Sequence, residues 1–244
     1  MSNGRVSEAS SGYVLHARPY LETSLLVEAY CEDFGRIGLV ARGARAARSA
    51  LRGLLRPFQP LVLAWRSRGD LATLTRAEAD GCAHLLVGPA VATGLYLNEL
   101  IMRTVARHDP QPELYHAYAR ALLGLSQSAH FEPTLRVFEK RLLEVLGYGL
   151  LLDVDANDGT DVDPAAIYCY ERERGPVRVQ GDRVAGCLVS GATLLAIRDE
   201  RLTDERVLKE ARSILRAALQ PHLGARPVLS REIFRGLASA GDDA

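Results

Sequence analysis

The residues best suited to chemistry in this sequence are arginines that gather between Arg36 and Gly69. This stretch holds eight arginines and no aspartate or glutamate. Guanidinium groups bind phosphate oxygens through paired hydrogen bonds, and they stack on nucleobases. The pattern therefore predicts a surface for a polyanion such as a nucleic acid, formed by Arg36, Arg42, Arg45, Arg48, Arg52, Arg56, Arg66 and Arg68.

This positive charge is local, because the 244-residue chain carries 30 basic and 30 acidic residues and no formal net charge. Negative charge collects elsewhere, at Asp153, Asp155, Asp158, Asp161 and Asp163. A segregated patch attracts polyanions even when the net charge is zero. The simpler alternative is a solvated basic surface that binds nothing.

The motifs of the common enzyme and metal sites are missing. The sequence contains no P-loop, no glycine-rich dinucleotide fingerprint, no HExxH, no GxSxG and no EF-hand loop. The six histidines are not paired at ligand spacing, and the four cysteines form no CxxC pair. We therefore expect no catalytic residues, no metal and no cofactor, and we expect that the protein is not an enzyme.

The arginines lie among short apolar segments that turn residues separate. Five such segments at this spacing indicate a small antiparallel barrel or sandwich. The predicted strands are Tyr13–Arg18, Ser24–Tyr30, Arg36–Arg42, Pro60–Arg66 and Leu71–Glu78. Residues 44–55, between the third and fourth strands, form either a short helix or a mobile loop.

Strand alternation predicts which side chains face solvent. In the third strand Arg36 and Arg42 share the outer face, and Ile37 lies on the inner one. In the fourth strand Trp65 shares its face with two leucines, which favours a core position. If that face is instead exposed, Trp65 is a platform on which a base can stack.

The rest of the chain has mainly helical periodicity. Helices are predicted from about residue 90 to 105, 114 to 125, 135 to 146 and 204 to 220, the last with Thr203 as its N-cap, and a short final helix begins at Ser230. Residues 150–190 lose this periodicity. The predicted fold class is α+β, with a barrel domain over residues 1–82 and a helical domain over residues 83–244.

No membrane segment is predicted. The N-terminus lacks an apolar core, and the longest stretch without charge, residues 81–98, is broken by Gly88 and Pro89. The four scattered cysteines are expected to be free thiols in a reducing compartment. We therefore expect a cytoplasmic protein.

Five sequence blocks in order resemble the bacterial RecO family of recombination mediators. They are GYVLH at residues 12–16, GRIGLVARGAR at 35–45, LLRPFQPL at 54–61, FEKRLLEVLGY at 138–148 and HLGARPVLSRE at 222–232. The resemblance covers about residues 12–237. It implies an N-terminal OB-fold barrel of five strands and a mainly helical C-terminal domain.

The resemblance also implies a function. Such a protein binds single- and double-stranded DNA, anneals complementary strands, and works with RecR and the C-terminal tail of single-strand-binding protein. It thereby promotes RecA loading on gapped DNA in the nucleoid. The alternative is a non-enzymatic scaffold whose basic barrel face binds an acidic protein rather than DNA.

Two further expectations follow from comparing this chain with the family. Many members carry a four-cysteine zinc knuckle, but residues 150–190 here have no CxxC and form an irregular insertion that packing must hold. The acidic tail of single-strand-binding protein needs an apolar pocket rimmed by cations. The candidates for that contact are Arg136, Phe138, Lys140 and Arg141, although an ordinary amphipathic helix carries the same charges.

Overall fold

The computed structural model describes residues 9–68, 71–179, 186–228 and 230. By their internal contacts the elements form two compact units, one of residues 1–127 with 227–244 and the other of residues 128–226. The helices that follow the barrel in sequence, up to residue 127, belong to the first unit. The division into domains after residue 82 stays a prediction.

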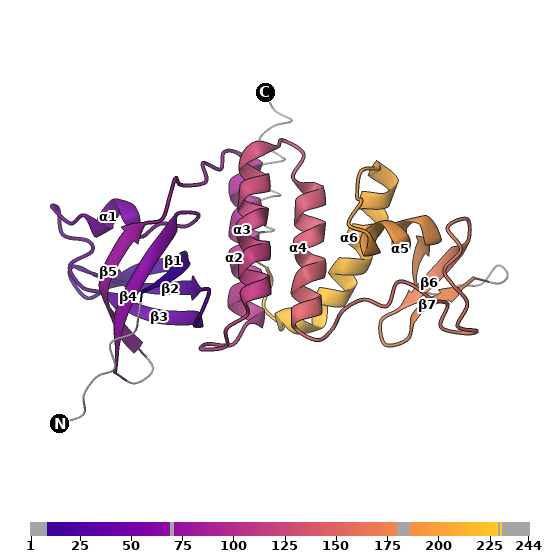
Figure 1. Ribbon diagram of the computed structural model, residues 1–244, viewed down its shortest axis with the longest axis horizontal. Helices are drawn as coiled ribbons and strands as arrows, with labels where there is room; N and C mark the ends of the chain where they lie inside the picture. The colour runs from indigo at the N-terminus through magenta and orange to yellow at the C-terminus, as the bar shows by residue number, and fades with distance from the viewer. Residues whose placement is uncertain (1–8, 69–70, 180–185, 229, 231–244) are drawn as a thin grey trace. The chain divides into compact units, whose positions relative to one another are not determined.

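The first unit begins with the five predicted strands, which form the closed barrel of an OB fold in the order β1-β2-β3-β5-β4 (Figure 1). They are β1 (Ser10–Tyr20), β2 (Ser24–Cys31), β3 (Gly35–Ala41), β4 (Pro60–Arg68) and β5 (Leu71–Ala79). All neighbouring pairs are antiparallel except β3 with β5. The segment for which the sequence allows either a helix or a loop contains turns and one short helix, α1 (Leu51–Leu54).

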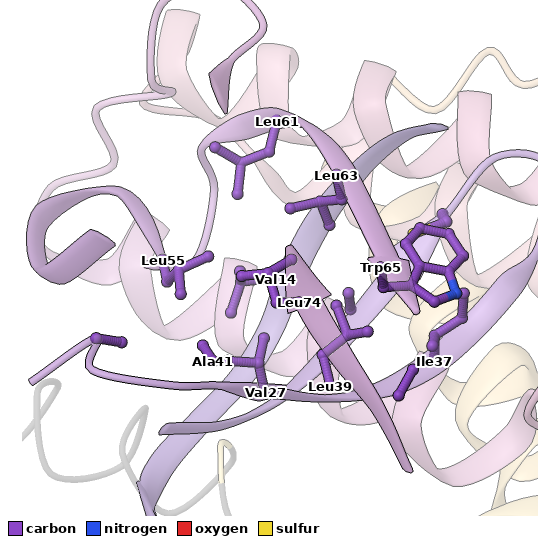
Figure 2. Packing of buried hydrophobic residues seen from close by; sticks show 14 residues of the cluster. Val14, Val27, Ile37, Leu39, Ala41, Leu55, Leu61, Leu63, Trp65 and Leu74 are labelled. Carbon is purple, nitrogen blue, oxygen red and sulfur yellow. The ribbon is translucent and has the colours of Figure 1, made fainter. Parts of the chain in front are cut away.

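Alternation along these strands builds the barrel core. The inward side chains include Val14, Val27, Leu39, Leu63 and Trp65, and they pack as one cluster of buried residues (Figure 2). Most of their neighbours along the strands are polar, charged or half-buried, although Tyr13 and Leu15 beside Val14 are also buried. The apolar pattern that predicted the strands is therefore the pattern that fills the barrel.

The turn between β2 and β3 requires glycine. Gly35 has φ of +67°, and a Cβ atom there would lie 2.2 Å from the carbonyl oxygen of Asp109. The backbone NH of His108 also donates to the carbonyl of Arg36 at 3.0 Å. The segment after α2 thus packs closely against the start of β3.

Helices α2 (Pro89–Thr104) and α3 (Pro112–Gln127) follow the barrel in the first unit (Figure 1). The Asn98 side chain on α2 donates to the carbonyl of Leu15 at 2.9 Å and accepts from the hydroxyl of Tyr118 at 2.6 Å. The rings of Tyr13 and Tyr118 meet edge to face at 5.2 Å. A buried polar bridge and aromatic contacts therefore fix the barrel to its own two helices.

The second unit combines helices with a small sheet. Its helices are α4 (Glu132–Val145), α5 (Gly191–Arg198), α6 (Glu205–Leu219) and the 3-10 helix η1 (Gln220–Leu223). Its strands are β6 (Ile167–Glu171), β7 (Gly175–Arg178) and β8 (Cys187–Ser190), and they form a sheet in the order β7-β6-β8. The sequence pattern did not predict α5. The N-cap of α6 is Asp204 rather than Thr203, because the Asp204 carboxylate accepts the backbone NH of Arg206 at 2.9 Å. The final helix predicted from Ser230 lies outside the described residues, apart from Ser230 itself.

Candidate nucleic-acid interface

The basic segment of the barrel, defined here as residues 42–56, leaves the end of β3 and is anchored at several points. Ala41 pairs with Leu25, and the backbone NH of Arg45 donates to the carbonyl of Thr23 at 2.8 Å. Ala44 and Leu55 are buried in the barrel core, against which Leu51 and Leu54 also pack. The apolar residues of the segment therefore point inward and hold its backbone against the barrel.

The arginines between these anchors point the other way. Five are exposed: Arg42, Arg45, Arg48, Arg52 and Arg56. None of them forms an ion pair with any residue that the structure describes. Their charge is thus not neutralised by the described part of the chain.

Arg66 extends this positive charge onto the barrel wall. It is exposed on β4 and pairs in register with Thr73 of β5, which in turn pairs with Val40 of β3. Arg66 therefore lies two strands away from the strand that leads into the basic segment. The side chain of Arg68 lies outside the described residues.

Arg36 differs from the other predicted arginines, and the expectation that it faces freely outward is corrected. Its side chain is only 17% exposed and lies 3.8 Å from the Glu28 carboxylate. Its guanidinium donates to the carbonyl of Met102, and burial lowers its pKa. Arg36 joins β3 to the end of α2, so it is not available to a ligand as Arg42 is.

The structure also decides between the two interpretations of Trp65. This side chain is buried in the barrel core and meets Phe34 edge to face at 5.0 Å. It therefore offers no platform for a base.

The sequence pattern did not predict Tyr20 as a site residue, and this side chain is 38% exposed at the end of β1. The alternation of His16, Arg18 and Tyr20 was the available signal, but the predicted strand stopped at Arg18.

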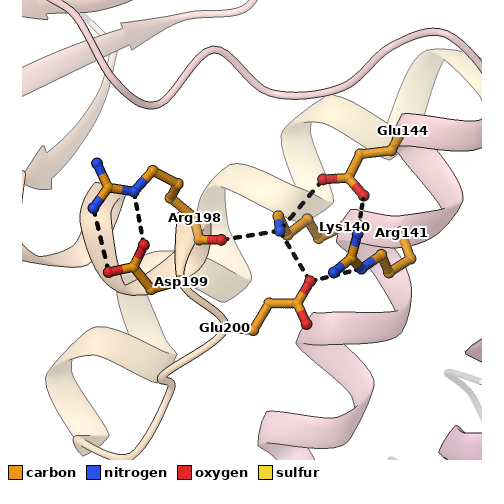
Figure 3. Close-up of polar contacts among 6 residues, drawn as sticks. All are labelled: Lys140, Arg141, Glu144, Arg198, Asp199 and Glu200. Carbon is orange, nitrogen blue, oxygen red and sulfur yellow. Dashed lines mark hydrogen bonds and ion pairs between the residues drawn. The ribbon is translucent and has the colours of Figure 1, made fainter.

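The second predicted set of residues lies on α4, and its members differ in exposure. Phe138 is buried, and Arg136 is buried in an ion pair with Glu139 at 2.8 Å. Lys140 is also buried, and its ammonium lies 2.9 Å from Glu200 and 3.3 Å from Glu144 (Figure 3). Arg141 is exposed, and it contacts the same two carboxylates at 2.7 and 3.1 Å.

Comparisons with known proteins match most of the chain to one family. A family model described as Recombination protein O N terminal matches residues 6–81, and one described as Recombination protein O C terminal matches residues 88–232. The chain is 48% identical to the DNA repair protein RecO of Alkalilimnicola ehrlichii, over 98% of this chain and 94% of that one. It is 46% identical to the DNA repair protein RecO of Pseudomonas aeruginosa, over 93% and 94% respectively.

The chain belongs to the RecO family. A third relative, the DNA repair protein RecO of Nitrosococcus oceani, is 43% identical over 94% of each chain. The barrel that carries the basic segment falls within the N-terminal RecO match, and α4 falls within the C-terminal one.

In residues 150–190 of this RecO-family chain, side-chain hydrogen bonds and ion pairs hold the segment in which we expect many family members to carry a zinc knuckle. The buried Asp155 carboxylate accepts the backbone NH of Asn157 at 2.9 Å and that of Arg178 at 3.2 Å. Arg178 also pairs with Asp163 at 3.0 Å, and Arg198 pairs with Asp153 at 3.3 Å.

Apolar packing completes this segment. Leu152 and Val162 from the acidic loop are buried in the same cluster as Tyr168 and Ile214. Within the described ranges, no group of three histidine, cysteine or acidic side chains is placed to hold a metal ion. No helix in those ranges is both long and apolar enough to span a bilayer.

Proposed function

We propose that this protein binds single- and double-stranded DNA through the basic segment of its barrel and acts in recombinational DNA repair. The observation that carries the proposal is the set of five exposed arginines, none of which is paired with a described acid. Membership of the RecO family and the naming of its relatives as DNA repair proteins support the same function.

The chemistry of the segment suits the phosphate backbone. Each exposed guanidinium can offer paired hydrogen bonds to phosphate oxygens, and binding releases counterions from the DNA. Such contacts depend on charge rather than on base sequence, so affinity falls steeply as salt rises. Arg66 on β4 widens the positive surface beyond the segment itself.

We further propose that the protein anneals complementary strands. Two single strands repel each other through their phosphates, and a surface rich in arginine reduces that repulsion when both strands bind close together. No step of this process breaks or forms a covalent bond, so we propose that the protein is not an enzyme. We place it in the cytoplasm, at the nucleoid.

The proposed partners are RecR and the C-terminal tail of single-strand-binding protein, with which the protein would promote RecA loading on gapped DNA. Of the α4 set, Arg141 remains the candidate for the acidic tail, because its guanidinium is exposed. Phe138, Arg136 and Lys140 are buried and act in packing and ion pairing. Loss of tail-peptide binding in Arg141→Ala would support this contact, and unchanged binding would remove it.

Two assays test the proposed function, one of DNA binding and one of strand annealing. We expect the wild-type protein to bind a labelled single strand and to speed pairing of complementary oligonucleotides, both more weakly at high salt. The triple variant Arg42→Ala/Arg52→Ala/Arg56→Ala should bind DNA more weakly and anneal strands more slowly than the wild type, while keeping its thermal stability. Binding of polyglutamate but not of DNA would contradict the proposal and favour the scaffold alternative.

A further inference from the structure

Tyr20 has an unusual position among the aromatic side chains of the barrel. The other aromatics of its described residues are buried or half-buried: Tyr13, Tyr30, Phe34, Phe58 and Trp65. Tyr20 is 38% exposed at the end of β1. An exposed ring beside a basic surface is the combination that proteins use to bind unpaired bases.

Strand register places Tyr20 beside the arginines. Tyr20 pairs with Ser24, and Arg18 pairs with Leu26 of β2, which pairs with Val40 of β3. The core-facing residues of this region are the alternate ones, including Ala17, Leu25 and Ala41. Arg18 and Tyr20 therefore lie on the outer face of β1, and the exposed Arg42 directly follows the last residue of β3, at the edge of the same sheet.

The distances across this face suit a single strand. Neighbouring strands lie about 4.8 Å apart, so β1 and β3 are separated by about 10 Å. Leu26 on β2 lies between them and pairs with Val40 on β3, and both residues are half-buried, which leaves an apolar floor on this face. Exposed arginines stand on both sides of that floor, Arg18 on β1 and Arg42 at the end of β3.

The basic segment itself fixes the hairpin that carries Tyr20. The guanidinium of Arg45 donates to the carbonyl of Leu21 at 3.4 Å and to that of Glu22 at 3.3 Å. The backbone NH of Arg45 donates to the carbonyl of Thr23. Leu21 is held in the left-handed region with φ of +53°, which a leucine rarely adopts. The turn is thus set by the segment that is proposed to bind phosphate.

The nearby acids define the path that a strand would take. Glu22 is exposed at the tip of the hairpin and repels phosphate there. Glu28, on the same outer face as Arg18, is neutralised by Arg36 and Arg107. The face between Arg18 and Arg42 is therefore the side of the hairpin that suits an anion.

We propose that Tyr20 stacks on an unpaired base of a single-stranded nucleic acid whose neighbouring phosphates are bound by Arg18 and Arg42. This inference rests on the proposed DNA-binding function and adds a contact that electrostatics does not supply. Stacking needs a free π face, so Tyr20 distinguishes single strands from duplexes, whereas the arginines bind both.

The test compares Tyr20→Ala, Tyr20→Leu and Tyr20→Phe with the wild type by fluorescence anisotropy. The probes are a thymidine oligonucleotide of about 20 nucleotides, an abasic strand of equal length and a duplex. Tyr20→Ala and Tyr20→Leu should weaken binding to the thymidine strand by about five- to 100-fold, and Tyr20→Phe should bind like the wild type. The abasic strand and the duplex should bind all four proteins equally.

A matched control is Tyr148→Ala, which removes another exposed tyrosine and should leave all binding unchanged. The slope of log affinity against log salt should be the same for Tyr20→Ala as for the wild type, because stacking releases no counterions.

Several outcomes would overturn the inference. Equal binding of Tyr20→Ala and the wild type to the thymidine strand overturns stacking but leaves the proposed DNA binding standing. If Tyr20→Ala weakens binding to the abasic strand as much as binding to the thymidine strand, Tyr20 belongs to a general anion-binding surface, and stacking is again overturned. Failure of the wild type to bind any DNA overturns the proposed function and this inference together.

Discussion

The arginines of the basic segment and many arginines of the second unit are used in opposite ways. Arg42, Arg48, Arg52 and Arg56 face solvent and pair with no described acid. In residues 128–226, arginines that pair with acids include Arg136, Arg141, Arg174, Arg178, Arg198, Arg206 and Arg212. Arginine is therefore unpaired and exposed in the basic segment, whereas these seven arginines of the second unit form ion pairs within their own unit.

This difference shows why a count of charges is a poor guide to function. An arginine with a carboxylate partner contributes little field beyond its immediate surroundings, whereas unpaired arginines add their potentials. The acidic loop of residues 153–163 looks like a counterweight to the basic segment in the sequence. In the structure its aspartates cap turns and pair with arginines of their own unit.

The largest expected effect on stability comes from the barrel core. Trp65→Ala should lower the free energy of unfolding by about 3–5 kcal/mol, because it removes a large buried ring that packs against Phe34. Chemical denaturation measures this loss, and Trp65→Phe should recover most of it. At a temperature where Trp65→Ala is folded, its DNA affinity should equal that of the wild type. A selective loss of DNA binding would instead make Trp65 part of the interface.

The next effect concerns a paired cation of the second unit. Lys140→Met should lower the free energy of unfolding by about 2–3 kcal/mol, because Glu144 and Glu200 lose a buried partner. Its control is Arg141→Met, which removes a cation that reaches the same carboxylates from an exposed position and should cost less than about 1 kcal/mol. Chemical denaturation of both variants measures these two losses of unfolding free energy. Equal losses would contradict the buried role of Lys140 and the exposed role of Arg141.

A smaller effect depends on pH. Partial burial would raise the pKa of Glu210, but hydrogen bonds from Ser190, Thr193 and Arg206 outweigh it and lower that pKa to about 2. A depressed carboxyl pKa stabilises the fold above the unfolded value of 4.5, and this stabilisation is lost as pH falls toward 2.

Glu210→Gln should therefore be less stable than the wild type by about 1–2 kcal/mol at neutral pH, since Glu210 is only half-buried and solvent screens part of its interactions. The difference should shrink as pH falls below 4.5. Thermal unfolding across pH measures it, with Glu173→Gln, an exposed acid, as the control. A difference that is constant with pH would show that Glu210 acts through packing alone.

Much of the fold follows from local sequence patterns. Alternation and turn residues predicted all five barrel strands, and helical periodicity predicted α4 and α6. The eight-residue helix α5 was missed because it is too short to show a clear period. The cap of α6 was placed one residue early because both Thr203 and Asp204 are good N-cap residues, and only the hydrogen bonds distinguish them.

The candidate site was predictable in charge but not in side-chain partners. The basic run and its lack of acids identified the segment that is exposed in the structure. Alternation alone could not separate Arg36 from Arg42, because the partners of Arg36 include Met102 and Arg107, which are distant in sequence. Tyr20 was missed for a related reason, since its exposure beside the basic segment depends on the register of β1 with β2.

We propose that unpaired arginines of the barrel, and not paired arginines elsewhere, bind DNA. The most direct test is the salt dependence of single-strand binding for two triple variants that remove equal charge. Arg42→Ala/Arg52→Ala/Arg56→Ala should reduce the slope of log affinity against log salt by about 2, since each phosphate that is no longer neutralised removes about 0.7. Arg174→Ala/Arg206→Ala/Arg212→Ala should leave the slope of the wild type unchanged. Equal slopes for the two variants would contradict the account.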